Sequence, residues 1–514
     1  MAAAVGILVS GCASGGGSPT PADTPRKGGS LTLSLPGDAA SFDPTQTMFA
    51  NVADGQRLAA VYDNLLWTDP GTGTVQPNIA ESLVPEREGA AWVLRIRPGV
   101  KFSDGTPYDA AAVAANWQWH KLPANKSFQT MAVLNIKALD VDPADPLVLH
   151  ITLGQANANF DRIVARNLSF IAAPKTLDGA GTARDKPVGA GPFLLKEWTK
   201  GPKGRQVYVR NPDYWEKDKG LPYLDELIIK PELDIEHAVK GLGTDADLTV
   251  TVDPKNLALA RDHGLDVQEL RLNGGAMVLF NTATGPFADP RARRAVALAL
   301  SGSEINDKFY KGAGTPAKGI FSSSSPLANN QIAAPENDGA QAAQLFDEVT
   351  GNGAKPLEFT YVTPAAPTTV AVAQYMQAKL AAYRGVSMSI REVDVPTYIG
   401  TVRKGSGAWN AAVGQQWIDD PEPGVYDVLN AASFANLSGY NSPAVNAALD
   451  EARRTTDTAA RREAYTRVQL QVNRDMPFWV YQEAVAAALS TSKVAGLQLF
   501  NDGLIHWDRI GLSA

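Results

Sequence analysis

The stretch WVLRIRPGVKFSDGTP, residues 92–107, joins a strand pattern to two turns within a short span. Large apolar residues stand at 92, 94 and 96, and this period of two is typical of a half-buried β-strand. The pairs at 98–99 (Pro-Gly) and 104–105 (Asp-Gly) then turn the chain, because glycine adopts backbone angles closed to most residues. An alanine-rich run at 109–119 follows and predicts a helix. Strand, turn and helix in direct succession indicate a mixed α/β fold.

The same patterns alternate along the rest of the chain. Period-two alternation predicts further strands at 28–35, 148–153, 206–210, 227–230, 357–362 and 386–393. Longer helices are expected at 291–300, 444–454 and 457–474. Asp289, Ser442 and Asp457 precede or open these helices, and each can accept a hydrogen bond from the first helical N–H groups.

Length and charge bound the class of protein. With 514 residues the chain is too long for one hydrophobic core, so we expect at least two lobes. A formal net charge of −7 gives no electrostatic reason to expect nucleic acid as a partner. The five histidines offer no local pair, which argues against a histidine-built metal site. We therefore expect no metal, no cofactor and no nucleic acid.

The single cysteine, Cys12, stands near the start of the sequence. A short apolar run precedes it and ends in small residues, as at a signal-peptidase site. A Gly/Ser/Pro-rich stretch follows to Pro25 and is typical of a flexible tether. The arrangement resembles a bacterial lipoprotein lipobox at 9–12, so we expect Cys12 to carry lipid. An incidental cysteine in a disordered N-terminus is the alternative.

Familiar catalytic motifs are absent from the sequence. It has no Gly-x-Ser-x-Gly elbow, no His-Glu-x-x-His and no glycine-rich phosphate loop. The one cysteine lies outside any expected core, which excludes thiol chemistry in the body of the chain. Carboxylates are plentiful, so a paired-carboxylate hydrolase stays open as an alternative. We expect the protein not to be an enzyme.

Several motifs, in order along the chain, carry a family resemblance. They are VYDNLL at 61–66, QPNIAES at 76–82, the opening stretch at 92–107, PVGAGPF at 187–193, RNPDYW at 210–215, FNT at 280–282, PFADPRARRA at 286–295, Trp417, YNSP at 440–443 and MPF at 476–478. Together they resemble family 5, the peptide/nickel family, of the extracellular solute-binding proteins of ABC importers. The most specific of them is the stretch at 92–107.

The resemblance implies a periplasmic-binding-protein-like α/β fold, with two mixed α/β lobes on a hinge and an extra lobe inserted into the first. By analogy, the signal, lipobox and tether take 1–27. The first main lobe takes 28–58, 186–275 and 485–514, the inserted lobe 59–185, and the second main lobe 276–484.

The resemblance also implies a function. We expect a monomer, lipid-anchored on the outer side of the bacterial cell membrane, that captures a di- or oligopeptide and delivers it to the permease of an ABC transporter. Nickel chelates, haem, opines and oligosaccharides remain alternative ligands within the family. An extracellular hydrolase, or a lipoprotein that senses a ligand without transporting it, are alternatives from other classes.

The segment 409–423 is the most suggestive of ligand chemistry. In peptide-binding relatives, a Trp and then an Asp at this place face the cleft, and the Asp pairs with the peptide's α-ammonium, since a buried ammonium needs a charged acceptor. Counting back from Pro423 selects Asp419, whereas counting on from Trp417 selects Asp420. We expect Asp419 to bind the ammonium. The alternative is that both acids cap a turn.

Four further residues are candidates for ligand contacts. Trp417 and Trp409 have aromatic faces that suit varied apolar side chains, although a core position is the better expectation for Trp409. Gly37 follows the opening strand, where relatives hydrogen-bond an extended ligand's backbone. Asn281 stands near the expected crossing between lobes. No basic residue maps onto the positions that hold a ligand carboxylate in relatives.

Overall fold

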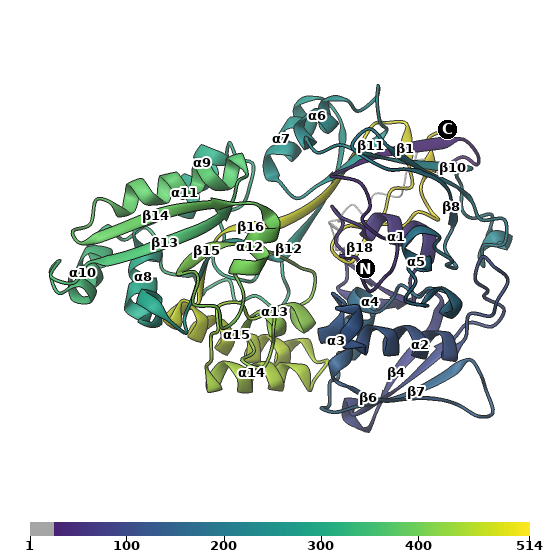
Figure 1. The fold of residues 1–514 in the computed structure, drawn as a ribbon, viewed down its shortest axis with the longest axis horizontal. Helices are drawn as coiled ribbons and strands as arrows, with labels where there is room; N and C mark the ends of the chain where they lie inside the picture. The colour runs from purple at the N-terminus through teal and green to yellow at the C-terminus, as the bar shows by residue number, and fades with distance from the viewer. Residues whose placement is uncertain (1–24) are drawn as a thin grey trace, which may run out of the picture.

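The computed structural model describes residues 25–514, so Cys12 and the expected lipobox lie outside the described residues. A ten-stranded mixed sheet in the order β14-β13-β15-β12-β16-β11-β1-β10-β9-β8 runs through the molecule (Figure 1). Its strands are β1 (Ser30–Leu35), β8 (Phe193–Thr199), β9 (Arg205–Arg210), β10 (Glu226–Pro231), β11 (Leu248–Thr251), β12 (Asp266–Phe280), β13 (Leu357–Pro364), β14 (Val386–Val393), β15 (Ala411–Ile418) and β16 (Phe478–Ser490).

A second sheet of four antiparallel strands stands apart from the first, in the order β4-β5-β7-β6. Its strands are β4 (Ala80–Glu86), β5 (Ala91–Ile96), β6 (Ile136–Val141) and β7 (Val148–Leu153). Helices α2 (Ala110–Lys121), α3 (Thr130–Leu134) and α4 (Phe160–Asn167) belong to this part, and a hairpin of β2 (Leu66–Asp69) and β3 (Thr74–Pro77) precedes it. In Figure 1 it lies below the first strands of the large sheet.

The other helices accompany the large sheet. They are α1 (Gly55–Tyr62), α5 (Thr182–Asp185), α6 (Ile235–Lys240), α7 (Pro254–Asp262), α8 (Pro290–Leu298), α9 (Gly302–Phe309), α10 (Gly339–Thr350), α11 (Pro367–Leu380), α12 (Val395–Thr401), α13 (Pro421–Leu429), α14 (Pro443–Arg453) and α15 (Thr458–Asp475). Helices α8 to α15 gather around β13, β14 and β15, on the left of Figure 1.

Two long strands, β12 and β16, cross between the two halves of the large sheet. They pair antiparallel with each other on both sides of a bulge between Leu272 and Met277. Gly274 and Gly275 occupy that bulge with φ of 87° and 127°, a region that favours glycine. A Cβ on Gly275 would stand 1.9 Å from the carbonyl oxygen of Gln482. The crossing therefore depends on glycine at this point.

Buried apolar residues form separate clusters on the two sides of the bulge. One gathers β1, β10, β11 and the C-terminal segment around Trp507. Another packs α2 and α4 against the four-stranded sheet around Trp117. Two more cover the second half of β12 with β13, β15 and β16, around Trp479 and Trp409. Each cluster is large enough to organise its own part of the chain.

The expected strands and capped helices are confirmed within small shifts at their ends. Asp109 accepts a hydrogen bond from the Ala112 N–H at 2.9 Å and opens α2. Asp289 opens α8 in the same way, with Arg291 N–H as donor at 2.8 Å. Ser442 and Asp457 cap α14 and α15. Local hydrophobic patterning and helix capping therefore predicted these elements correctly.

Candidate ligand-binding cleft

A cavity of about 960 Å³ lies beside the first half of β12. Its walls come from distant segments: β12, the β2–β3 turn, the loop at 322–327, the start of α13 and the start of α15. Uncharged polar side chains are the largest group in the lining, beside charged and apolar ones, namely Thr68, Thr72, Thr74, Asn273, Ser322, Ser324, Ser325, Thr456, Thr458 and Asn501. Among the residues described, none that lines it is aromatic. Its volume lies within the roughly 300–1,000 Å³ typical of small-molecule sites.

β12 contributes an open strand edge to this cavity. One edge of β12 pairs with β16 along 266–272, whereas β15 joins the other edge only from Asn273 onward. Within residues 25–514 no further strand pairs along that second edge, and 269–273 line the cavity. A neighbouring cavity of about 450 Å³ continues past Gln268. An open edge presents N–H and C=O groups that an extended chain can join.

Asp419 lies in the cavity wall but is already paired inside the protein. Its carboxylate is bound by the guanidinium of Arg166 on α4, and its side chain is only 7% exposed. Arg166 also donates to the Trp417 carbonyl at 2.7 Å, and its Nη2 lies 3.9 Å from an Asp502 carboxylate oxygen. Burial alone would lower the pKa of Arg166, but Asp419 and Asp502 outweigh it and raise that pKa. Arg166 thus joins three segments that are distant in sequence.

Asp420 is held still more completely. Its Oδ1 accepts the Glu422 N–H at 2.9 Å, so Asp420 is the N-cap of α13. Arg461 Nη2 donates to the same oxygen at 2.5 Å, and Arg162 Nη1 donates to Oδ2 at 2.8 Å. The turn-capping alternative therefore describes Asp420 well, since its lone pairs are used within the protein.

Further contacts join the four-stranded part to the segment around α13 and α14. Asn157 Nδ2 donates to Glu422 Oε1 at 3.1 Å, and the Ala158 N–H donates to the Arg453 carbonyl at 2.9 Å. With the arginine pairs of Asp419 and Asp420, these bonds close one side of the cavity. The described arrangement is therefore a closed one at this edge.

The two tryptophans differ in environment. Trp417 is half-buried beside Leu270 and Leu272, and its carbonyl rather than its ring is what Arg166 binds. It does not appear among the residues that line the 960 Å³ cavity. Trp409 is 2% exposed within the cluster that contains Tyr465, as expected for a core residue.

Gly37 and Asn281 both serve local structure in the described arrangement. Gly37 has φ of 83° and its carbonyl accepts from Arg57 Nη2 at 2.6 Å. Asn281 is buried, and its Nδ2 donates to the carbonyls of Ser406 at 3.0 Å and Trp409 at 3.1 Å. Neither residue lines the 960 Å³ cavity.

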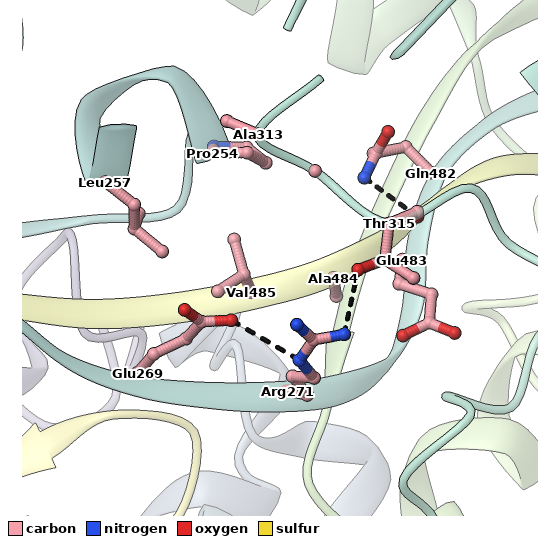
Figure 2. Close-up of a pocket in the computed structure, with 11 residues that line it drawn as sticks. Pro254, Leu257, Glu269, Arg271, Ala313, Thr315, Gln482, Glu483, Ala484 and Val485 are labelled. Atoms are coloured by element: carbon pink, nitrogen blue, oxygen red, sulfur yellow. Dashed lines mark hydrogen bonds and ion pairs between the residues drawn. The ribbon is translucent and has the colours of Figure 1, made fainter. Parts of the chain in front are cut away.

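Figure 2 shows the side of β12 that faces α7, close to the bulge. Arg271 points between Glu269 and Thr315, with Nε 3.4 Å from Glu269 and Nη1 2.8 Å from the Thr315 hydroxyl (Figure 2). Gln482 Nε2 donates to the Thr315 carbonyl at 2.8 Å. These bonds tie the loop at 313–315 to both crossing strands, and about 10 Å³ of space remains between them.

Residues 25–514 contain no helix long and apolar enough to cross a membrane. The same residues hold no group of three or more His, Cys, Asp or Glu side chains placed to bind a metal ion.

Residues 74–436 match the profile of the bacterial extracellular solute-binding proteins, family 5 (middle region). The chain belongs to this family. It is 26% identical over 488 residues to di/tripeptide-binding protein 2 of Pseudomonas aeruginosa, covering 87% of this chain and 88% of that protein. Extracellular solute binding is the activity that defines the family.

Solved structures agree on the fold of this family 5 protein. The oligopeptide-binding protein AppA of Bacillus subtilis, solved with a nonapeptide, superposes with a TM-score of 0.80 at 20% identity, covering 96% of this chain and 100% of AppA. The binding protein AgaA of A. tumefaciens R10, solved with agropinic acid, gives 0.81 at 20% identity, covering 95% and 99%. The expected periplasmic-binding-protein-like α/β fold is confirmed.

Sequence reasoning missed the three arginines that hold the acid pair of this family 5 protein. Arg162 and Arg166 lie one turn apart on α4, and Arg461 lies on α15. The spacing of 162 and 166 places both on one helical face, so the sequence alone could have indicated that they act together. Their partners, however, are more than 200 residues away in sequence, and only the fold shows that pairing.

Proposed function

We propose that this protein captures a di- or oligopeptide-like ligand in the cleft beside β12 and delivers it to an ABC importer. The observation that best supports this proposal is the open edge of β12 in a cavity with many hydroxyl and amide groups. A peptide main chain needs alternating donors and acceptors, and a strand edge supplies both without selecting side chains. The peptide-binding names of a relative and of a solved neighbour agree with this ligand class.

The lobes proposed for this mechanism are those expected by analogy: 28–58, 186–275 and 485–514 for the first, 59–185 for the inserted lobe, and 276–484 for the second. The bulge at Gly274 and Gly275 lies on the boundary at 275 and supports a hinge there. On this view, closure brings α4 against the segment that follows β15, and the ligand lies between them and β12.

Asp419 is the proposed acceptor of the ligand's α-ammonium. β15 runs antiparallel to β12 and ends at Ile418, so a ligand continuing along the open edge in the same direction would start beside Asp419. Its N-terminus would then meet the carboxylate that Arg166 holds. Ammonium binding is therefore an exchange, in which the ligand takes the place of one arginine bond. Asp420, which is fully used by α13, Arg162 and Arg461, positions this segment.

The remaining candidates act around this exchange. Trp417 is proposed to support the ligand's first residues from beside Leu272, Gly37 to meet the ligand backbone from the first lobe, and Asn281 to fix the loop at 406–410. Trp409 supports the second lobe from its core.

The partners of the proposed receptor follow from this role. A lipid on Cys12 would hold a monomer at the outer side of the membrane, on a Gly/Ser/Pro-rich tether. A receptor of this kind passes its ligand to the permease and carries out no chemistry on it. Radiolabelled ligand should therefore be recovered unchanged after incubation, and turnover by the purified chain would count against the proposal.

An opine-like ligand is the second candidate, because a cavity with many hydroxyl and amide groups also suits a polyhydroxylated small acid. The agropinic acid bound to AgaA shows that such a ligand fits this fold. A thermal-shift screen of the purified chain separates the two. A ligand at 100 times its dissociation constant stabilises the folded form by about 2.7 kcal/mol. Peptides that shift the melting temperature support the first proposal, whereas a shift with opines and none with peptides would replace it by the second.

A further inference from the structure

A second cavity, of about 360 Å³, lies on the far side of the contact between α4 and α13. Ile163 and Asn167 of α4 line it, whereas Arg162, one position earlier, lines the large cavity. In α13, Pro421 lines the large cavity and Tyr426 and Asp427 line the smaller one. The α4–α13 contact therefore separates two cavities, and both are built from the same pair of segments.

Asp427 is the chemically distinctive residue of this second cavity. Within the described chain, no hydrogen bond and no ion pair of 4.0 Å or less reaches its carboxylate. The charged groups that act on its carboxylate are Glu422, Arg453 and Arg166. Burial, followed by the charge of Glu422, raises the pKa of Asp427 to about 7. A carboxylate in such surroundings costs stability unless something pairs with it.

The neighbouring arginines are committed to other acids. Arg453 Nη2 donates to Glu422 Oε1 at 2.6 Å, and the Arg453 guanidinium stacks on the Tyr426 ring at 3.3 Å from its centre. Arg166 binds Asp419. When it is ionised, Asp427 is therefore a surplus negative charge in this contact, and the group that would balance it is a cation.

The rim of the cavity is apolar. Phe128 lies just before α3 and Leu134 is the last residue of α3. Both line the cavity, and they are 63% and 55% exposed. Met131, Ile163 and Pro423 are further apolar residues of the lining. Exposed apolar groups around a half-buried, unpaired carboxylate match an amphipathic ligand, with its charge inside and its apolar body against the rim.

We propose that this cavity binds an organic cation, a primary ammonium or a guanidinium carried on an apolar body, with the cation on Asp427. A ligand there touches α3 and α4 on one side and α13 on the other, so it would stabilise the closed contact between these segments. The site is separate from the peptide cleft and does not depend on the proposed peptide ligand.

Calorimetric titration with benzylammonium tests the site, with benzyl alcohol as the uncharged match. The wild-type protein should bind benzylammonium and not benzyl alcohol. Asp427→Asn should weaken benzylammonium binding by about tenfold to a hundredfold, the loss expected for a hydrogen bond to a charged group. Asp307→Asn is the matched control, because Asp307 is an exposed helical residue on α9, and it should bind like the wild type.

Asp419→Asn distinguishes this site from the peptide cleft. If the inference holds, that variant keeps benzylammonium binding even if it loses peptide binding. Loss of benzylammonium binding in Asp419→Asn but not in Asp427→Asn would place the cation in the peptide cleft and overturn the inference. Equal affinity for benzylammonium and benzyl alcohol, or no binding of benzylammonium by the wild type, would overturn it as well.

Discussion

Arg166 occupies the carboxylate that the proposed peptide ammonium needs, so replacing it should tighten the binding of peptides with a free N-terminus. We consider Arg166→Met, which keeps an unbranched side chain of similar length and removes the charge. In the wild type, a ligand ammonium that reaches Asp419 must displace at least one of two charge-assisted bonds, those from Arg166 to Asp419 and to the Trp417 carbonyl.

The magnitude follows from the bond that is exchanged. A hydrogen bond to a charged group contributes about 1.5–3 kcal/mol, and Arg166 is 21% exposed, so solvent screening favours the lower half of that range. Removing the competitor should therefore strengthen ammonium binding by about tenfold to fortyfold, or about 1.5–2.2 kcal/mol. Asp502, whose pKa burial already raises to about 6, loses its cation too and should take up a proton near neutral pH.

Isothermal titration with a tripeptide and its N-acetylated form measures the effect. The free tripeptide should bind Arg166→Met more tightly than the wild type, and the acetylated form should show no such gain. Lys379→Met, an exposed basic residue on α11, is the control for removing a positive charge elsewhere. If Arg166→Met binds the free tripeptide more weakly than the wild type does, Arg166 supports the ligand and the exchange mechanism is refuted.

Three other changes have clear expected outcomes. Asp427→Asn should raise the melting temperature, and by more at pH 8 than at pH 5. The folded pKa of Asp427, about 7, lies above its unfolded value, so the wild type loses up to about 4 kcal/mol of stability as pH rises from about 4 to about 7, whereas asparagine does not titrate. A flat difference between the two pH values would contradict this. Gly275→Ala should destabilise the fold by about 2–4 kcal/mol in denaturant unfolding, because its Cβ would stand 1.9 Å from the Gln482 carbonyl oxygen, whereas Gly99→Ala, with open space around its Cβ, should cost less. Asp420→Ala should cost about 3–5 kcal/mol by leaving Arg162 and Arg461 unpaired and α13 uncapped, and an unchanged melting temperature would show that these bonds contribute little.

Local signals in the sequence were sufficient for most short elements and insufficient for the crossing strands. Asp289, Ser442 and Asp457 each cap the helix they were expected to open, and Asp109, at the start of the expected run 109–119, caps α2. β16 was not predicted, although it connects the halves of the sheet. Its sequence, FWVYQEAVAAALS, is buried at every position, so it shows no alternation, and its alanines favour a helix when considered alone. Pairing with β11 and β12 overrides that preference.

In the candidate site, the pairing of the charged residues likewise could not be predicted from local sequence. The motif around Trp417 and Pro423 directed attention to Asp419 and Asp420, and the fold places both in the wall of the large cavity. The motif alone could not show that each aspartate is already bound by an arginine from another segment. Such pairs join residues 41 to 258 positions apart, so no local pattern encodes them. The choice between an ammonium site and a helix cap is likewise a matter of tertiary contacts, and these assign the cap to Asp420.

The internal pairing of both acids bears on how a receptor of this kind would work. A carboxylate left free in a closing cleft would lose hydration without compensation whenever the lobes met in the absence of ligand. Arg166 supplies that compensation for Asp419, so the closed contact can form without a ligand, and under the proposed exchange the ligand would gain only the difference between its own bonds and those of Arg166. Such an exchange would lower the affinity for any single ammonium, so the open edge of β12 would have to supply the remaining binding free energy. This protein should therefore discriminate ligands more by their extended main chain than by their N-terminal charge.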